Sequence, residues 1–136
     1  MAKQSGIPFT TLSVDDSAGS VEAIINDITN CQFATPRGVQ DVTGLDKSAH
    51  ERILLLADFS ITLNGPFNPA ASPSSHDVFK TVPSTSVART VTITVASKTL
   101  PNETLFTDYS LNRAASGELT FTAPGVLSNG TVPTWA

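Results

Sequence analysis

The side chains best suited to catalysis are few in this sequence and poorly arranged for it. There are two histidines, His50 and His76, and the second stands in the run Ser75-His76-Asp77. That run contains the residue types of a hydrolase triad. Consecutive residues of an extended chain point to opposite sides, however, whereas a triad is assembled from distant positions. We therefore interpret His76 as an ordinary loop histidine, and we expect no catalytic residues and no enzymatic activity.

The sequence does not indicate a nucleophile, metal or cofactor site either. The lone cysteine, Cys31, has no recognisable base near it, so we interpret it as a small, partly buried apolar residue. Asp15 and Asp16 form an acidic pair, but calcium takes about six to eight oxygen ligands, which favours a solvated turn. Glycine-rich phosphate-binding loops and the zinc-binding pattern H-E-x-x-H are absent from the sequence. We expect no metal and no cofactor.

Composition excludes several classes of protein. The 136 residues suffice for one domain, and twelve acidic against eight basic residues give a net charge of −4. Binding nucleic acid by charge needs a basic stripe, which this balance argues against. No run approaches the roughly 20 apolar residues of a membrane helix, and the N-terminus lacks the apolar segment of a secretory signal. We expect no membrane anchor, and synthesis in a cytoplasm.

The hydrophobic pattern predicts strands. Only 15% of the residues are charged, while serine and threonine are abundant, and hydroxyl-rich, β-branched chains favour strands over helices. Residues 21–33 fit either a strand or a helix. Alternation of apolar and polar residues predicts strands over 9–14, 39–43, 58–67, 90–95, 105–111 and 119–123, with Pro124-Gly125 closing the last one.

One short helix and one long loop complete the predicted fold. Ser48-Ala49-His50-Glu51 matches the S-x-x-E capping box and predicts a helix over 48–56, although an unbroken strand over 52–63 also fits. Residues 65–86 contain four prolines and form a loop longer than the usual limit of about 12–15 residues, which is typical of functional or disordered segments. The sequence therefore predicts a mainly β, antiparallel β-sandwich or barrel.

One stretch of the sequence carries a recognisable motif. The run from Asp41 to Arg52, DVTGLDKSAHER, is followed by a strand that ends near Phe67. Residues 75–79 (SHDVF), 107–118 (TDYSLNRAASGE) and 129–135 (NGTVPTW) add to the pattern. Together they resemble the major tail proteins, or tail tube subunits, of long-tailed, siphovirus-type phages, particularly those of actinobacterial hosts. The resemblance covers roughly residues 25–135.

The resemblance implies a structural virion protein of the phage tail, assembled in the host cytoplasm. Members of that family are β-sandwich subunits that form six-fold rings, and the rings stack into a hollow tube through which the genome leaves. The implied partners are further copies of the chain and the tape measure, tail terminator and tail-tip proteins, while genomic DNA passes without specific binding. We recognise no appended immunoglobulin-like domain, so residues 1–136 are expected to form a single tube domain.

The resemblance also assigns roles to particular residues. Loop 65–86 is expected to pack on a neighbouring subunit instead of its own sandwich, through Pro69, Pro73, His76, Val78 and Phe79. A channel for DNA must not hold phosphates, so we expect a neutral to negative wall of hydroxyl side chains on strands 58–64, 90–95 and 118–122. The candidate channel-facing residues are Ser60, Thr62, Thr90, Thr92, Thr94, Thr120 and Thr122. The alternative is that these hydroxyl faces meet solvent outside the tube.

Two other interpretations fit the same composition. A capsid decoration or head–tail joining protein of a phage would share the hydroxyl-rich strands but would assemble differently. A stand-alone carbohydrate-binding sandwich is less well supported, because such modules present exposed aromatic side chains and this chain has one tryptophan and one tyrosine.

Overall fold

The computed structural model describes residues 3–136, and most of its regular structure is β-strand. Every strand pairing is antiparallel, which confirms the predicted fold class. Within residues 3–136, no helix has the length and apolar character needed to cross a membrane. The elements are β1 (Phe9–Asp15), β2 (Val21–Ala23), the 3-10 turn η1 (Ile25–Asp27), β3 (Asn30–Ala34), β4 (Arg37–Asp41), β5 (Arg52–Ala57), β6 (Ser60–Pro66), α1 (Ser75–Phe79), β7 (Arg89–Val95), β8 (Lys98–Phe106), β9 (Ser110–Arg113) and β10 (Leu119–Leu127).

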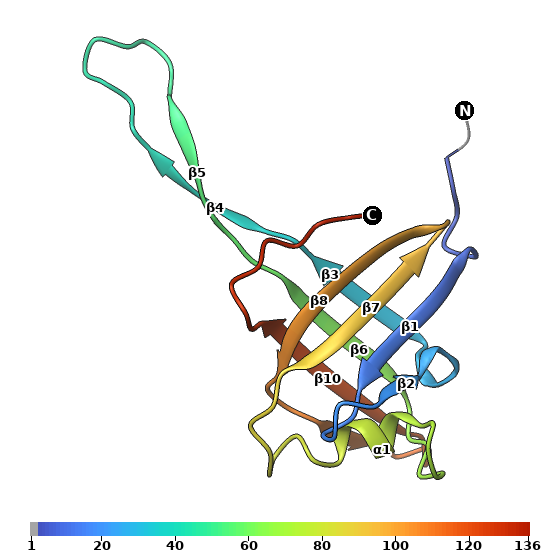
Figure 1. Ribbon diagram of the computed structural model, residues 1–136. Helices are drawn as coiled ribbons and strands as arrows, with labels where there is room; N and C mark the ends of the chain where they lie inside the picture. Colours follow the sequence, from blue (N-terminus) through green and yellow to red (C-terminus); the bar gives the residue numbers. More distant parts are fainter. Residues whose placement is uncertain (1–2) are drawn as a thin grey trace.

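One sheet folds over on itself to make two layers (Figure 1). Its strand order is β2-β1-β7-β8-β10-β6-β3, and β9 also pairs with β10. β10 pairs with β8 through only three residues, Gly125 to Leu127, so the sheet turns sharply there. We call β2, β1, β7 and β8 the first layer, and β3, β6, β10 and β9 the second layer.

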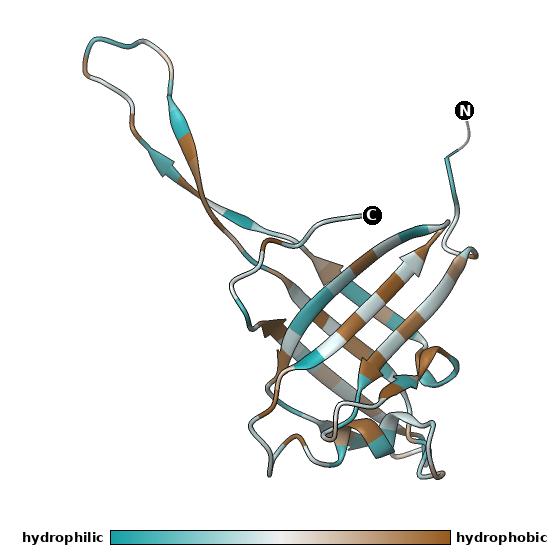
Figure 2. Cartoon of the chain, viewed as in Figure 1, coloured by the Kyte–Doolittle hydropathy of each residue, from teal (hydrophilic) through white to brown (hydrophobic). Residues whose placement is uncertain are grey.

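The core lies between the two layers, and strand alternation fills it. On β7, Val91 and Ile93 are fully buried, while the threonines between them point outward. On β6, Ile61 and Leu63 are buried in the same way. Figure 2 shows this alternation as brown and pale bands along the strands. The predicted inward and outward faces of these two strands are therefore confirmed.

Helix α1 closes one end of the sandwich. Its N-cap is Ser74, whose hydroxyl accepts a hydrogen bond from the backbone N–H of Asp77 at 3.1 Å. Val78 and Phe79 are fully buried, and the Phe79 ring lies 5.0 Å from Phe106 and 5.9 Å from Phe121 between centroids. The expectation that these two residues pack on a neighbouring subunit instead of their own sandwich is therefore wrong. They complete the chain's own core.

A long hairpin projects from the opposite end of the sandwich (Figure 1). Its strands, β4 and β5, continue β3 and β6 beyond the sheet and pair only with each other. The predicted helix over 48–56 is wrong, because the backbone N–H of Glu51 donates to Thr43 Oγ1 across the hairpin at 2.8 Å and β5 begins at Arg52. The alternative of a strand here is the better one, although it breaks at Asp58 and Phe59 before β6. We call residues 37–57 the arm.

The C-terminal segment, residues 128–136, lies along the outer edge of β8. Ser128 N–H donates to the carbonyl of Glu103 at 3.0 Å. Further on, Thr99 and Ala136 exchange two backbone hydrogen bonds of 3.0 and 2.8 Å. The Trp135 ring lies 6.1 Å from that of Phe33 on β3, so the segment links the two layers.

Several strand limits differ from the prediction. Residues 105–111 are not one strand, since β8 ends at Phe106 and β9 begins at Ser110. β10 continues through Pro124-Gly125 and does not end there as predicted. Pro124 lies at the point where the partner of β10 changes from β9 to β8, so the N–H that proline lacks is not needed for strand pairing. Residues 21–33 contain β2, η1 and β3 in place of a single element.

Gly65→Ala tests the packing of β6 on η1. A Cβ at Gly65 would lie 1.9 Å from the carbonyl oxygen of Asp27, so backbone must move, and we expect the free energy of unfolding to fall by about 2–4 kcal/mol. Gly6→Ala is the matched control, because no atom lies within 4 Å of its added Cβ. Thermal melting measures both, and equal melting temperatures for the two variants would contradict this packing.

Candidate functional site

The outward face of the second layer is uncharged across all four strands. In-register rows join Asn30 to Asn64, Thr122 and Ser110, and Gln32 to Thr62 and Pro124. We define the second-layer face as the outward residues Asn30, Gln32, Ala34, Ser60, Thr62, Asn64, Pro66, Ser110, Asn112, Thr120, Thr122, Pro124 and Val126. Hydroxyl and amide groups can hydrogen-bond water without attracting phosphates by charge.

Four of the predicted channel residues belong to this face: Ser60, Thr62, Thr120 and Thr122. Thr122 Oγ1 donates to Asn64 Oδ1 across the strands at 2.8 Å, which fixes the orientation of both side chains. The sequence analysis missed the contribution of β3 and β9. β3 has two inward apolar residues, Cys31 and Phe33, and β9 has only Leu111 at such a position, so a clear period-two signal needs more residues than these strands contain.

The outward face of the first layer also carries hydroxyl groups, but it includes acidic residues. Thr94 Oγ1 and Thr99 Oγ1 lie 3.1 Å apart on neighbouring strands. Thr90 Oγ1 hydrogen-bonds to the carboxylate of Glu103, its partner on β8. This face contains the three remaining predicted channel residues, Thr90, Thr92 and Thr94.

The predicted channel residues therefore divide into two sets that point in opposite directions. Both layers bury their inner sides in one core, so their outer sides face away from each other. Thr62 and Thr92 are both half-buried, on opposite surfaces of the subunit. The two sets cannot line the same channel wall, and the choice between them remains a prediction.

The edges of the two layers also differ. β3 and β9 each pair on one side only, so both edges of the second layer offer unpaired backbone N–H and C=O groups. The first layer ends at β2, which has only three residues, and at β8, whose edge is partly covered by residues 128–136. Short or covered edges resist pairing with another chain. Edge-to-edge growth is therefore favoured through the second layer.

The remaining residues of the predicted inter-subunit loop lie around α1. Pro69 and Pro73 are exposed, and their contact with a neighbour stays a prediction. His76 is half-buried: its Nδ1 lies 3.1 Å from the Tyr109 hydroxyl and its ring packs edge-on against Phe67 at 5.0 Å. Burial raises the pKa of Tyr109. His76 thus serves the chain's own packing.

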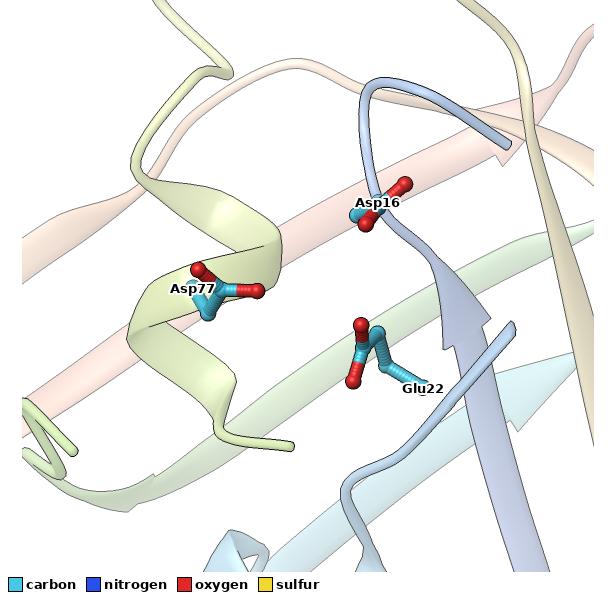
Figure 3. Close-up of side chains that lie close together, drawn as sticks. All are labelled: Asp16, Glu22 and Asp77. Carbon is cyan, nitrogen blue, oxygen red and sulfur yellow. The ribbon is translucent and has the colours of Figure 1, made fainter. Parts of the chain in front are cut away.

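Three carboxylates converge beside α1, from Asp16, Glu22 and Asp77 (Figure 3). One oxygen of each lies within 4.8 Å of the others. Each already has a donor: Asp16 accepts the backbone N–H of Ser20 at 2.9 Å, Glu22 accepts the Ser72 hydroxyl, and Asp77 pairs with the Lys80 ammonium at 3.1 Å. Of these contacts, only the hydrogen bond between Glu22 and Ser72 joins β2 to the segment before α1, while those of Asp16 and Asp77 stay within the β1–β2 turn and within the helix end.

Arg89 supports the same end of the fold from inside. Its guanidinium is buried and donates to the carbonyls of Asp15 and Val78 at 3.1 and 2.9 Å and to the Thr81 hydroxyl at 2.9 Å. Burial lowers the pKa of Arg89, and the negative charges of Asp16 and Asp15 oppose that shift. These carboxylates therefore help to keep a buried cation charged.

Comparison with known proteins identifies the fold. No protein-family model and no curated protein sequence matches this chain. One similar solved structure is a chain described as "Virion of native gene transfer agent (GTA) particle", with a TM-score of 0.74 and 15% sequence identity, covering 97% of this chain and 99% of that one. Another is "Tail of empty GTA particle computed with helical refinement, C6 symmetry", with a TM-score of 0.71, 18% identity and 98% of each chain covered. The fold extends over nearly the whole of each chain.

The orientation of β3 can be tested by thiol chemistry on the unassembled protein. Burial raises the pKa of Cys31 to about 11, two units above 9.0, so we expect alkylation at pH 8 on the order of 100-fold slower than for an ordinary exposed thiol. A Gln32→Cys substitution in a Cys31→Ser background places a thiol on the outward side and should react at the ordinary rate. Equal rates for Cys31 and for the thiol at position 32 would contradict the inward orientation of Cys31.

Proposed function

We propose that this chain is a tail tube subunit that assembles into six-fold rings, and that the rings stack into a hollow tube for DNA. The observation that supports it best is the uncharged second-layer face, carried by four strands with both edges open. The shared fold with a chain of a C6-symmetric tail supports the same proposal. On this account residues 1–136 act as one tube domain, and the second layer lines the channel.

The open edges provide a mechanism for ring closure. β3 of one copy can pair with β9 of the next, so that no sheet edge stays open to solvent. Six copies of a four-stranded layer would then form a closed barrel of 24 strands. Strands about 4.8 Å apart and tilted by about 40° give a barrel about 50 Å across between backbones, which leaves room for a DNA duplex inside the side chains.

The uncharged second-layer face would let DNA pass along the channel without binding it. Affinity for DNA comes chiefly from phosphate contacts with lysine and arginine, and contacts repeated in every ring would add up along the tube. Amides and hydroxyls such as Asn64 and Thr122 keep water at the wall and give phosphates no fixed cation. The tape measure, tail terminator and tail-tip proteins, and a siphovirus-type tail, belong to this proposal through the resemblance in the sequence.

Electron microscopy of the purified protein tests the assembly. We expect rings with a central hole and six-fold symmetry, and stacks of such rings at high protein concentration. Trimers, or binding only to preformed capsids, would favour a decoration or joining protein. A protein that stays monomeric at high concentration contradicts the proposal.

Labelling of assembled tubes tests which layer lines the channel. In a Cys31→Ser background, Thr62→Cys and Thr92→Cys are matched variants, since both positions are half-buried on outward faces of opposite layers. We expect a small maleimide to label both variants in tubes, and a bulky polymer-linked maleimide to label only the thiol at position 92. Both thiols should react with the bulky reagent in the unassembled subunit. Protection of position 92 in place of position 62 would assign the wall to the first layer.

A further inference from the structure

The C-terminal segment contains an asparagine–glycine pair. Asparagine is chemically labile, and it deamidates most readily before glycine, because glycine has no side chain to hinder ring closure. The sequence has two such pairs, Asn64-Gly65 and Asn129-Gly130. They share the same dipeptide, so any difference in their reactivity comes from the fold around them.

The first pair is held in a strand that is paired on both sides. Asn64 lies opposite Thr122 of β10 and Asn30 of β3, and its Oδ1 accepts the Thr122 hydroxyl at 2.8 Å. Ring closure requires the Gly65 nitrogen to turn towards the Asn64 side chain, which an extended strand with two neighbours prevents. Gly65 is also buried, against the carbonyl of Asp27. The fold therefore protects this pair.

The second pair lies in a bend that leaves its reacting groups free. Asn129 and Gly130 are exposed and follow the end of β10, and Gly130 has a left-handed backbone with a φ of 72°. Within residues 3–136, no protein group accepts the backbone N–H of Gly130. The Thr131 N–H donates to Asn129 Oδ1 at 3.1 Å. A donor at this oxygen stabilises the negative charge that develops there as the ring closes.

We propose that Asn129 is a site of spontaneous deamidation, and that its product releases the C-terminal segment from β8 and β3. The Gly130 nitrogen attacks Cγ of Asn129, and the side-chain amide leaves as ammonia with the proton of the Gly130 N–H. Water then opens the resulting succinimide at either of its carbonyls, which yields aspartate or isoaspartate. The reaction needs only water, and the inference does not depend on the proposed tube function.

Isoaspartate changes the main chain between two anchors of the segment. Ser128 N–H holds the start of the segment to the carbonyl of Glu103 at 3.0 Å, and hydrogen bonds with Thr99 hold Ala136 at its end. In isoaspartate, Cβ becomes part of the backbone, so the chain between these anchors is one atom longer. We therefore expect the register between Ala136 and Thr99 to be lost.

Both products also place a new negative charge beside an acidic residue. Asn129 and Glu103 line the same hollow next to β8, together with Thr90, which hydrogen-bonds to the Glu103 carboxylate. No ion pair within residues 3–136 offsets the charge of Glu103. A second carboxylate at this hollow repels the first, and like charges on adjacent strands weaken their pairing. Charge and chain length thus act in the same direction.

Trp135 provides a spectroscopic signal for the release. It is the only tryptophan of the chain, and its ring lies 6.1 Å from that of Phe33 on β3. In the attached segment, 47% of its surface is open to solvent. Release removes the contact with Phe33 and exposes the rest of the ring, so quenching of its fluorescence by acrylamide should increase.

Ageing of the purified, unassembled protein at mildly alkaline pH tests both steps. Peptide mass spectrometry measures deamidation at each asparagine–glycine pair, in folded and in urea-unfolded protein, while acrylamide quenching of Trp135 is followed in parallel. Asn129→Gln is the matched control, because glutamine keeps an amide at this position and closes the corresponding larger ring far more slowly.

We expect Asn129 to deamidate at least tenfold faster than Asn64 in the folded protein, and the two to react at similar rates in urea. Quenching of Trp135 should increase with the extent of deamidation and stay constant in Asn129→Gln. Similar rates for the two pairs in the folded protein, or survival of Asn129 while the unfolded chain deamidates, would overturn the assigned site. Deamidation of Asn129 without a change in quenching would overturn the release of the segment.

Discussion

A single apolar core between two layers of sheet limits what this chain can present to other molecules. Each strand places alternate side chains in that core, so the remaining ones must form two outward faces that point in opposite directions. Ile61 and Leu63 turn Thr62 outward on the second layer, as Val91 and Ile93 turn Thr92 outward on the first. The core therefore determines which side chains face outward on each layer.

The segments that cover the core also make the edges of the first layer different from those of the second layer. Phe79 of α1 and Trp135 of the C-terminal segment cover opposite parts of the sandwich, and the same segment covers part of β8. Within residues 3–136, no segment pairs with the outer edge of β3 or of β9. Unpaired strand edges are usually a hazard, because they template further pairing. In the proposed ring, that tendency would join neighbouring subunits.

The parts of the fold set by local pattern could be predicted from the sequence, and the parts set by distant contacts could not. Alternation from Thr90 to Val95 predicted β7 and its faces. The helix predicted from the capping box at Ser48 is wrong because the backbone N–H of Glu51 donates to Thr43 across a hairpin. No local sequence pattern indicates the pairing of that hairpin. Val78 and Phe79 were predicted to contact a neighbouring subunit. Nothing near them in the sequence indicates that Phe79 packs against Phe106 and Phe121 of the same chain. Likewise, residues 52–56 were predicted to belong to a helix or to a longer strand, and only the structure shows that they form an exposed strand of the arm.

The central claim is that the second layer lines a channel in a ring of identical subunits. A helical reconstruction of the assembled tube, at a resolution that traces side chains, measures this most directly. The account predicts that β3, β6, β10 and β9 form the inner wall, with Asn64, Thr62 and Thr122 facing the channel. An inner wall built from β1, β7 and β8, with Thr92 at its surface, would contradict it.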